Sequence, residues 1–81
     1  MTTLHSKYVI VDSGLLYPIV FSEMIHHAEV VRAFGGCPIG AGFCYVDNNK
    51  YVCYGEATSL NVESRGEVDS LILNNLLGCV D

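Results

Sequence analysis

The chain has 81 residues, of which 51% are hydrophobic and 16% are charged, and its formal net charge is −5. This length corresponds to one small domain, residues 1–81, which buries only about 60–65% of its unfolded surface. The apolar content exceeds what such a monomer is expected to bury, so we expect a homodimer or larger assembly, or an obligate partner.

Charge and hydropathy also exclude several classes of partner. Charged residues interrupt every apolar run before the length of about 18 residues that a membrane span needs, and no secretory signal pattern is recognisable. Nucleic-acid-binding proteins gather Lys and Arg on one face, whereas the basic residues here are few and far apart, namely Lys7, Arg32, Lys50 and Arg65. We therefore expect a cytoplasmic protein that binds neither membrane nor nucleic acid.

The N-terminal part predicts two strands. Residues 1–6 are polar and are expected to fray. β-Branched and aromatic residues predict a strand over Lys7–Val11 and a second over about Leu16–Phe21. Because proline cannot donate to a strand ladder, Pro18 places the second strand at a sheet edge or at a bulge.

A first helix is expected to follow. Ser22 is its candidate N-cap, and the helix runs from Glu23 to the Gly35-Gly36 pair. Its buried stripe comprises Met24, Ile25, Ala28, Val31 and Phe34. The adjacent His26 and His27 point about 100° apart on a helix, so they cannot chelate one metal ion together. We interpret them as surface or interface histidines and expect no metal and no cofactor.

A second hairpin is predicted in more detail. Two apolar runs, Phe43–Val46 and Tyr51–Tyr54, flank a two-residue turn at Asn48-Asn49, because Asn tolerates the positive φ of a type I′ turn. This turn pairs Asp47 with Lys50 and Cys44 with Cys53. Alternation then places Phe43, Tyr45, Val52 and Tyr54 on one face and Cys44, Val46, Tyr51 and Cys53 on the other.

The last element is a helix with a clear start signal. Ser64-Arg65-Gly66-Glu67 matches a capping box, and Gly78 provides the C-terminal stop. Its apolar stripe is predicted to be Val68, Leu71, Ile72 and Leu76. The order β-β-α-β-β-α predicts an α+β fold, a four-stranded and mostly antiparallel sheet with two helices on one face. The face that carries the cysteines is expected to be covered by a partner subunit.

The sequence contains no recognisable catalytic constellation, so we expect a protein that is not an enzyme. The cysteines lack the close spacing of zinc ligands, and no cysteine has an activating context. We interpret Cys44 and Cys53, which the hairpin register places opposite each other, as reduced, small apolar residues that fill a tight sheet face.

Candidate binding residues surround bare glycine backbone. A small polar ligand or a partner would be bound by Gly40, Gly42, Gly55, Glu56, Ser59, Ser64 and Arg65. The alternative is that Glu56 pairs with Arg65 and the hydroxyls satisfy local backbone. An acidic cluster that could meet a basic protein comprises Glu56, Glu63, Glu67 and Asp69, although acids near a helix start are also ordinary.

Four short segments of the chain form a recognisable combination, namely Ala41-Gly42-Phe43, Tyr54–Leu60, Ser64-Arg65 and the helix that carries Asp69. Together they resemble small proteins encoded by bacteriophages and prophages. The resemblance implies a viral protein in the host cytoplasm. Many short, acidic phage proteins inhibit host defence, for example as anti-CRISPR proteins or as sponges for nucleotide signals.

Three functional hypotheses follow. The first is a non-enzymatic, homo-oligomeric binding protein that inhibits a host defence system by occupying a host protein. The second is a sponge that sequesters a small-molecule or nucleotide immune signal. The third is a small structural or assembly protein whose self-association is its whole task.

Overall fold

A four-stranded antiparallel sheet forms the centre of the computed structural model, which describes residues 4–78. The central strands are β1 (His5–Asp12) and β3 (Cys37–Asp47), and the edge strands are β2 (Leu16–Phe21) and β4 (Lys50–Tyr54), in the order β2-β1-β3-β4. The edge position predicted from Pro18 is confirmed. His5 and Ser6 begin β1, so the expected fraying is wrong for them, and residues 1–3 lie outside the described part.

Two helices and a short second hairpin complete the fold. α1 (His27–Phe34) follows β2, and α2 (Glu67–Leu77) ends the described chain. Between β4 and α2, β5 (Glu56–Ala57) pairs with β6 (Val62–Glu63) in a small antiparallel sheet. The α+β class and the four-stranded sheet are as predicted, and the β5–β6 pair is an addition.

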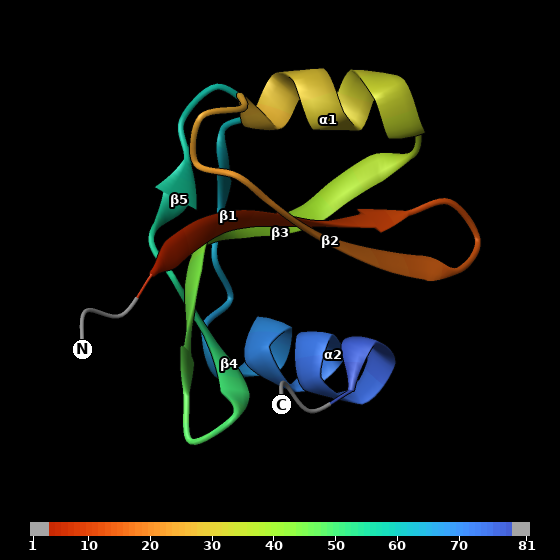
Figure 1. The fold of residues 1–81 in the computed structure, drawn as a ribbon. Helices are drawn as coiled ribbons and strands as arrows, with labels where there is room; N and C mark the ends of the chain where they lie inside the picture. Colours follow the sequence, from red (N-terminus) through yellow and green to blue (C-terminus); the bar gives the residue numbers. More distant parts are fainter. Residues whose placement is uncertain (1–3, 79–81) are drawn as a thin grey trace.

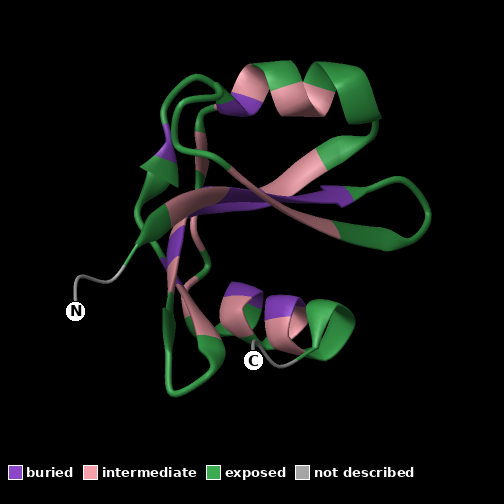
Figure 2. Ribbon diagram, in the orientation of Figure 1, coloured by how far each residue is buried: buried purple, intermediate pink, exposed green. Residues whose placement is uncertain are grey.

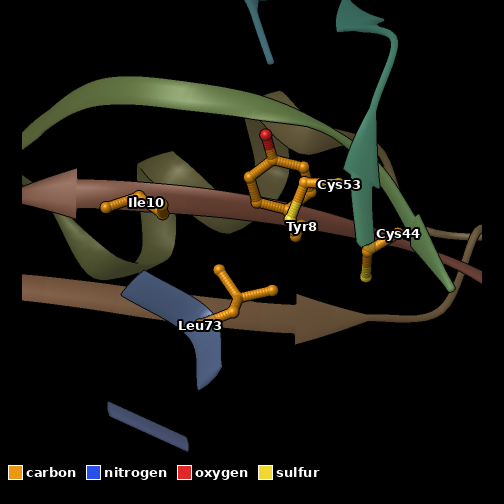
Figure 3. Packing of buried hydrophobic residues seen from close by; sticks show 5 residues of the cluster. All are labelled: Tyr8, Ile10, Cys44, Cys53 and Leu73. Carbon is orange, nitrogen blue, oxygen red and sulfur yellow. The ribbon is translucent and has the colours of Figure 1, made fainter. Parts of the chain in front are cut away.

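The two helices lie on opposite faces of the sheet, as Figure 1 shows. One core cluster contains Tyr8, Ile10, Cys44, Cys53 and Leu73, so it joins the sheet to α2 (Figure 3). The other joins the sheet to α1 and to the β5–β6 hairpin, through Val9, Val11, Ala41 and Ala57. Figure 2 shows the buried residues concentrated in the strands between the helices. The expectation that both helices share one face is therefore wrong, and α2 covers the cysteine face that was assigned to a partner.

The β3–β4 hairpin has the predicted register. Asp47 pairs with Lys50, and Cys44 pairs with Cys53. Asn48 and Asn49 have φ values of 51° and 63°, as a type I′ turn requires. The two-residue turn fixes every pairing behind it, so the division of side chains between the two faces also agrees with the prediction.

The first helix begins later than predicted. Ser22 Oγ accepts a bond from the Met24 amide, but α1 begins only at His27. Of its predicted stripe, Met24 and Phe34 are 86% and 54% exposed. The Ser22 carbonyl oxygen also accepts from the Ile25 amide at 3.0 Å, so the Ser22 hydroxyl caps a turn that precedes α1 and not α1 itself.

The predicted buried stripe of α2 is also largely wrong. Val68, Leu71 and Leu76 are each at least half exposed, whereas Asp69 and Leu73 are completely buried. The helix is rotated so that the Asp69 carboxylate points into the protein. Gly78 ends the helix with a φ of 80°, as predicted. Neither helix of residues 4–78 has the length and apolarity that a membrane crossing requires.

Candidate functional site

Three of the predicted binding residues, Gly40, Ser64 and Arg65, meet around Tyr8 and Asp69. Tyr8 Oη lies 2.5 Å from Asp69 Oδ2 and 2.7 Å from Ser64 Oγ. Arg65 donates to the same carboxylate twice, from Nε to Oδ1 at 2.7 Å and from its backbone amide to Oδ2 at 3.0 Å. These bonds replace the predicted capping box, because the carboxylate of Asp69 holds the chain at the start of α2.

The proton positions in this network follow from its chemistry. A carboxylate only accepts, so the single phenolic proton of Tyr8 goes to Asp69, and the Ser64 hydroxyl donates to Tyr8 Oη. Ser64 Oγ in turn accepts from the Gly66 amide at 3.1 Å. Burial raises the pKa of Tyr8, and the bond to Asp69 raises it further. In the described part of the chain every buried side-chain nitrogen and oxygen has a partner, so this cluster is a satisfied structural network.

Asp69 is therefore not part of a surface patch, because its side chain has no exposed area. The glycines also serve packing within the chain. A Cβ on Gly40 would lie 2.7 Å from Asp69 Oδ1, and one on Gly42 would overlap the Tyr54 carbonyl oxygen. Gly55, with a φ of 79°, turns the chain out of β4. Their backbone contacts other parts of this chain where a ligand was predicted.

The remaining predicted residues lie apart from this network. Glu56 and Glu63 face each other across the β5–β6 pair, and both are exposed. Ser59 is exposed in the turn between them, and Glu67 is exposed at the start of α2. Arg65 binds the buried carboxylate of α2, so its predicted pairing with Glu56 is wrong. The acidic surface thus consists of the hairpin pair and, separately, the helix start.

Side chains of α2 satisfy the outer edge of β4. Asn74 Oδ1 accepts from the Tyr51 amide at 2.8 Å, and Asn74 Nδ2 donates to the Tyr51 carbonyl at 3.2 Å. Ser70 Oγ accepts from the Cys53 amide at 2.9 Å. Beside these contacts, a shallow open hollow of about 220 Å³ is lined by Glu67, Ser70, Leu71 and Asn74. The helix thereby provides the bonds that a neighbouring strand would make.

The two paired thiols are poor nucleophiles in this environment. Burial raises the pKa of Cys44 to about 12 and that of Cys53 to about 11. Since the thiolate is the reactive form, a raised pKa lowers the fraction of each thiol that can react at neutral pH. They pack with Tyr8 and Leu73 as small apolar residues, in agreement with the interpretation from the sequence.

His27 is a buried histidine at the start of α1. Its ring lies 5.3 Å from that of Phe21 and 6.0 Å from that of Phe43, nearly perpendicular to both. Its Nε2 lies 2.8 Å from the Gly42 carbonyl oxygen, so Nε2 carries the proton. Burial lowers the pKa of His27, and the charge of Lys7 lowers it further. The interpretation as a surface or interface histidine is wrong for His27, which is 4% exposed, and agrees with the exposed His26.

Aromatic rings continue from His27 onto the open surface of the sheet. Phe43 and Tyr54 are stacked with centroids 5.8 Å apart, and Tyr45 lies 5.9 Å from Tyr54. His5 packs 5.4 Å from Tyr45, and its Nδ1 lies 2.6 Å from Tyr54 Oη. Tyr54 is 38% exposed. We call this surface the aromatic face and define it by His5, Phe43, Tyr45, Val52 and Tyr54.

The aromatic face is the part of the α1 side that α1 does not cover. The strand register places His5, Tyr45 and Val52 in one row across β1, β3 and β4. In Figure 1 the β3–β4 hairpin extends away from α1 towards the level of α2. The sequence predicted that Phe43, Tyr45, Val52 and Tyr54 share a face, but missed that His5 joins them, because residues 1–6 were expected to fray. Alternation along β1, continued two residues back from Lys7, would have placed His5 there.

Comparison of the chain with family models, with curated proteins and with solved structures finds no match in any of the three.

Proposed function

We propose that this chain is a non-enzymatic, self-associating binding protein that acts by contact with other proteins through the aromatic face. The observation that carries this proposal is a row of mutually packed rings on an open sheet surface, with Tyr54 38% exposed. Tyrosine is enriched at the centres of protein interfaces because it provides a large, rigid contact area together with a polar end.

The chemistry of the polar groups supports binding over catalysis. Asp69 is enclosed by Tyr8 and Arg65, and the buried thiols of Cys44 and Cys53 have raised pKa values. Catalytic acids, bases and nucleophiles need access to a substrate and a suitable pKa. The aromatic face offers apolar area and hydroxyl groups, which suit recognition.

The identity of the partner is a proposal that rests on the resemblance to phage proteins. The resemblance implies the host cytoplasm as the compartment, and we propose a host defence protein as the target. The exposed pair Glu56 and Glu63 would add charge complementarity to a basic target. The alternative of a sponge for a nucleotide signal has less support, since Arg65 is engaged by a carboxylate that would repel phosphate.

A photo-crosslinking experiment tests the proposed function. Benzoylphenylalanine at position 54 retains an aromatic side chain on the aromatic face, and the same residue at the exposed position 71 of α2 is the matched control. Irradiation of expressing cells is expected to give discrete protein adducts, with itself or with a host protein, at position 54 far more than at position 71. Equal labelling at the two positions would contradict the proposal.

A further inference from the structure

The aromatic face continues at both ends into charged side chains. At the hairpin tip, alternation places Asp47 and Lys50 on the same side of the sheet as Tyr45 and Val52. At the other end, Lys7 lies beside Phe43 in the register of β1 and β3. We call the aromatic face together with Asp47, Lys50 and Lys7 the strip. It carries an anion and a cation at the hairpin tip and a cation at the other end.

This distribution of charge favours a second copy of the chain as the occupant. The chain has four basic and nine acidic residues. The strip holds two of the basic residues, Lys7 and Lys50, and one of the acids, Asp47, and the acid Glu23 lies near Tyr54 at its margin. The strip with this margin therefore has a net charge of zero, whereas the rest of the chain carries −5. Two copies repel each other through most of their surfaces, which are acidic. The strip contains both signs of charge, so a basic residue of one copy can lie against an acidic residue of the other.

The size of the strip suits a reversible dimer. Three strands about 4.8 Å apart and three rows about 6.8 Å apart give a footprint of about 300 Å². A standard interface buries about 800 Å² per partner, which is about one-sixth of the accessible surface of 5154 Å². The aromatic face thus provides the centre of such an interface, and the surrounding segments provide its rim. A dimer of this kind dissociates on dilution.

Steric constraints select the orientation. α1 and the β5–β6 hairpin cover the sheet immediately beyond Phe43, so two copies with parallel hairpins would bring these covered regions into collision. Opposite orientation of the hairpins places each tip beside the partner's aromatic face. In a twofold contact the same surface serves both copies, and the row of His5, Tyr45 and Val52 then faces its own copy.

We propose that two copies of this chain pack face to face through the aromatic face. The twofold axis lies between the two sheets and runs perpendicular to the strands, so that Asp47 of each copy lies near Lys7 of the other. This inference rests on the proposed binding function and names the first partner as the chain itself. The result is a small sandwich of two sheets, and the acidic β5–β6 hairpins stay on its outside.

Sedimentation of the full chain over a concentration series, with reducing agent, tests the apolar centre of the contact. Wild type is expected to be a dimer that dissociates on dilution. Tyr45→Ala is expected to raise the dimer Kd about 30-fold, as a central aromatic contact does. Leu71→Ala, at an equally apolar but exposed position on α2, is the matched control and is expected to leave the Kd unchanged.

Charge exchange tests the orientation and does not depend on Tyr45. Asp47→Lys and Lys7→Glu are each expected to raise the Kd about tenfold, because each variant brings like charges together. An equimolar mixture of the two variants is expected to recover the wild-type Kd as a heterodimer, since both intermolecular pairs are then opposite in charge. A folding defect in either variant would not be repaired by mixing.

The outcomes separate this inference from the proposed function. A dimer that tolerates Tyr45→Ala, or charge variants that do not recover on mixing, would overturn the proposed contact and leave a self-associating protein. A wild type that stays monomeric at all concentrations would also overturn it. The crosslinking experiment at position 54 would then decide separately whether the aromatic face binds a host protein.

Discussion

The backbone of Gly40 lies directly against the carboxylate of Asp69, and a Cβ at position 40 would lie 2.7 Å from Oδ1 and 2.8 Å from Cγ. Gly40→Ala is therefore expected to displace the carboxylate from Tyr8 and Arg65 and to lower the free energy of unfolding by about 2–3 kcal/mol. Urea denaturation measures this loss.

The matched background for this change is Asp69→Ser, which shortens the side chain and removes the overlap. In that background Gly40→Ala is expected to cost less than about 1 kcal/mol, so the two changes are strongly non-additive. Additive losses would show that Gly40 is required for a reason other than contact with Asp69.

Asn74→Ala is expected to expose the outer edge of β4. It removes two hydrogen bonds to Tyr51 and should lower the free energy of unfolding by about 1–2 kcal/mol. The Tyr51 amide should exchange with deuterium faster, while the Cys53 amide keeps its bond to Ser70. Asn75→Ala, at the exposed neighbouring position, is the control, and an effect as large there would contradict the assigned role of Asn74.

The stability of the fold is expected to decrease in mild acid because of His27. Its folded-state pKa is lowered from 6.5 by burial, so below pH 6.5 the unfolded chain binds a proton that the folded chain does not. The free energy of unfolding thus falls as the pH drops through the window between 6.5 and the lower folded-state pKa, and this contribution is fully present above that window.

Urea denaturation at pH 7.5 and at pH 5 checks this dependence. The difference between the two pH values should shrink in His27→Gln and persist in His26→Gln, which changes the exposed neighbour. An equal pH dependence in wild type and His27→Gln would assign the effect to other groups.

The like-charge pair on the β5–β6 hairpin is expected to destabilise the fold. Glu56 and Glu63 lie directly opposite each other, so Glu63→Lys converts repulsion into attraction and should raise the free energy of unfolding by about 0.5 kcal/mol. High salt should reduce the gain. The double variant Glu56→Lys/Glu63→Lys restores a like-charge pair, so it should lose the gain in the free energy of unfolding. A gain that survives in the double variant would refute the electrostatic explanation.

The sequence predicts best the parts of the fold that local chemistry determines. The Asn48-Asn49 turn admits one pairing register, and all pairs from Asp47–Lys50 back to Phe43–Tyr54 follow from it. The positions of the glycines that end the helices, and the edge position of the strand with Pro18, are local signals of the same kind.

The arrangement of the helices depends on contacts far apart in the chain. Both faces of the β3–β4 hairpin are apolar, so the sequence does not distinguish helices on one side from helices on both. Asp69 resembles an ordinary acid of a helix first turn, but its buried carboxylate bonds Tyr8, which lies 61 residues away in the chain. Its spacing of four residues from Arg65 was the available signal for their ion pair.

The side-chain bonds at the outer edge of β4 hinder the addition of a further strand there. An unpaired strand edge is a template on which further strands add without limit, but here Asn74 already bonds the amide and the carbonyl of Tyr51, and Ser70 bonds the amide of Cys53. At the opposite edge, Pro18 lacks a backbone donor. Side-chain bonds at one edge and a missing backbone donor at the other therefore disfavour the growth of this chain into a continuous ribbon.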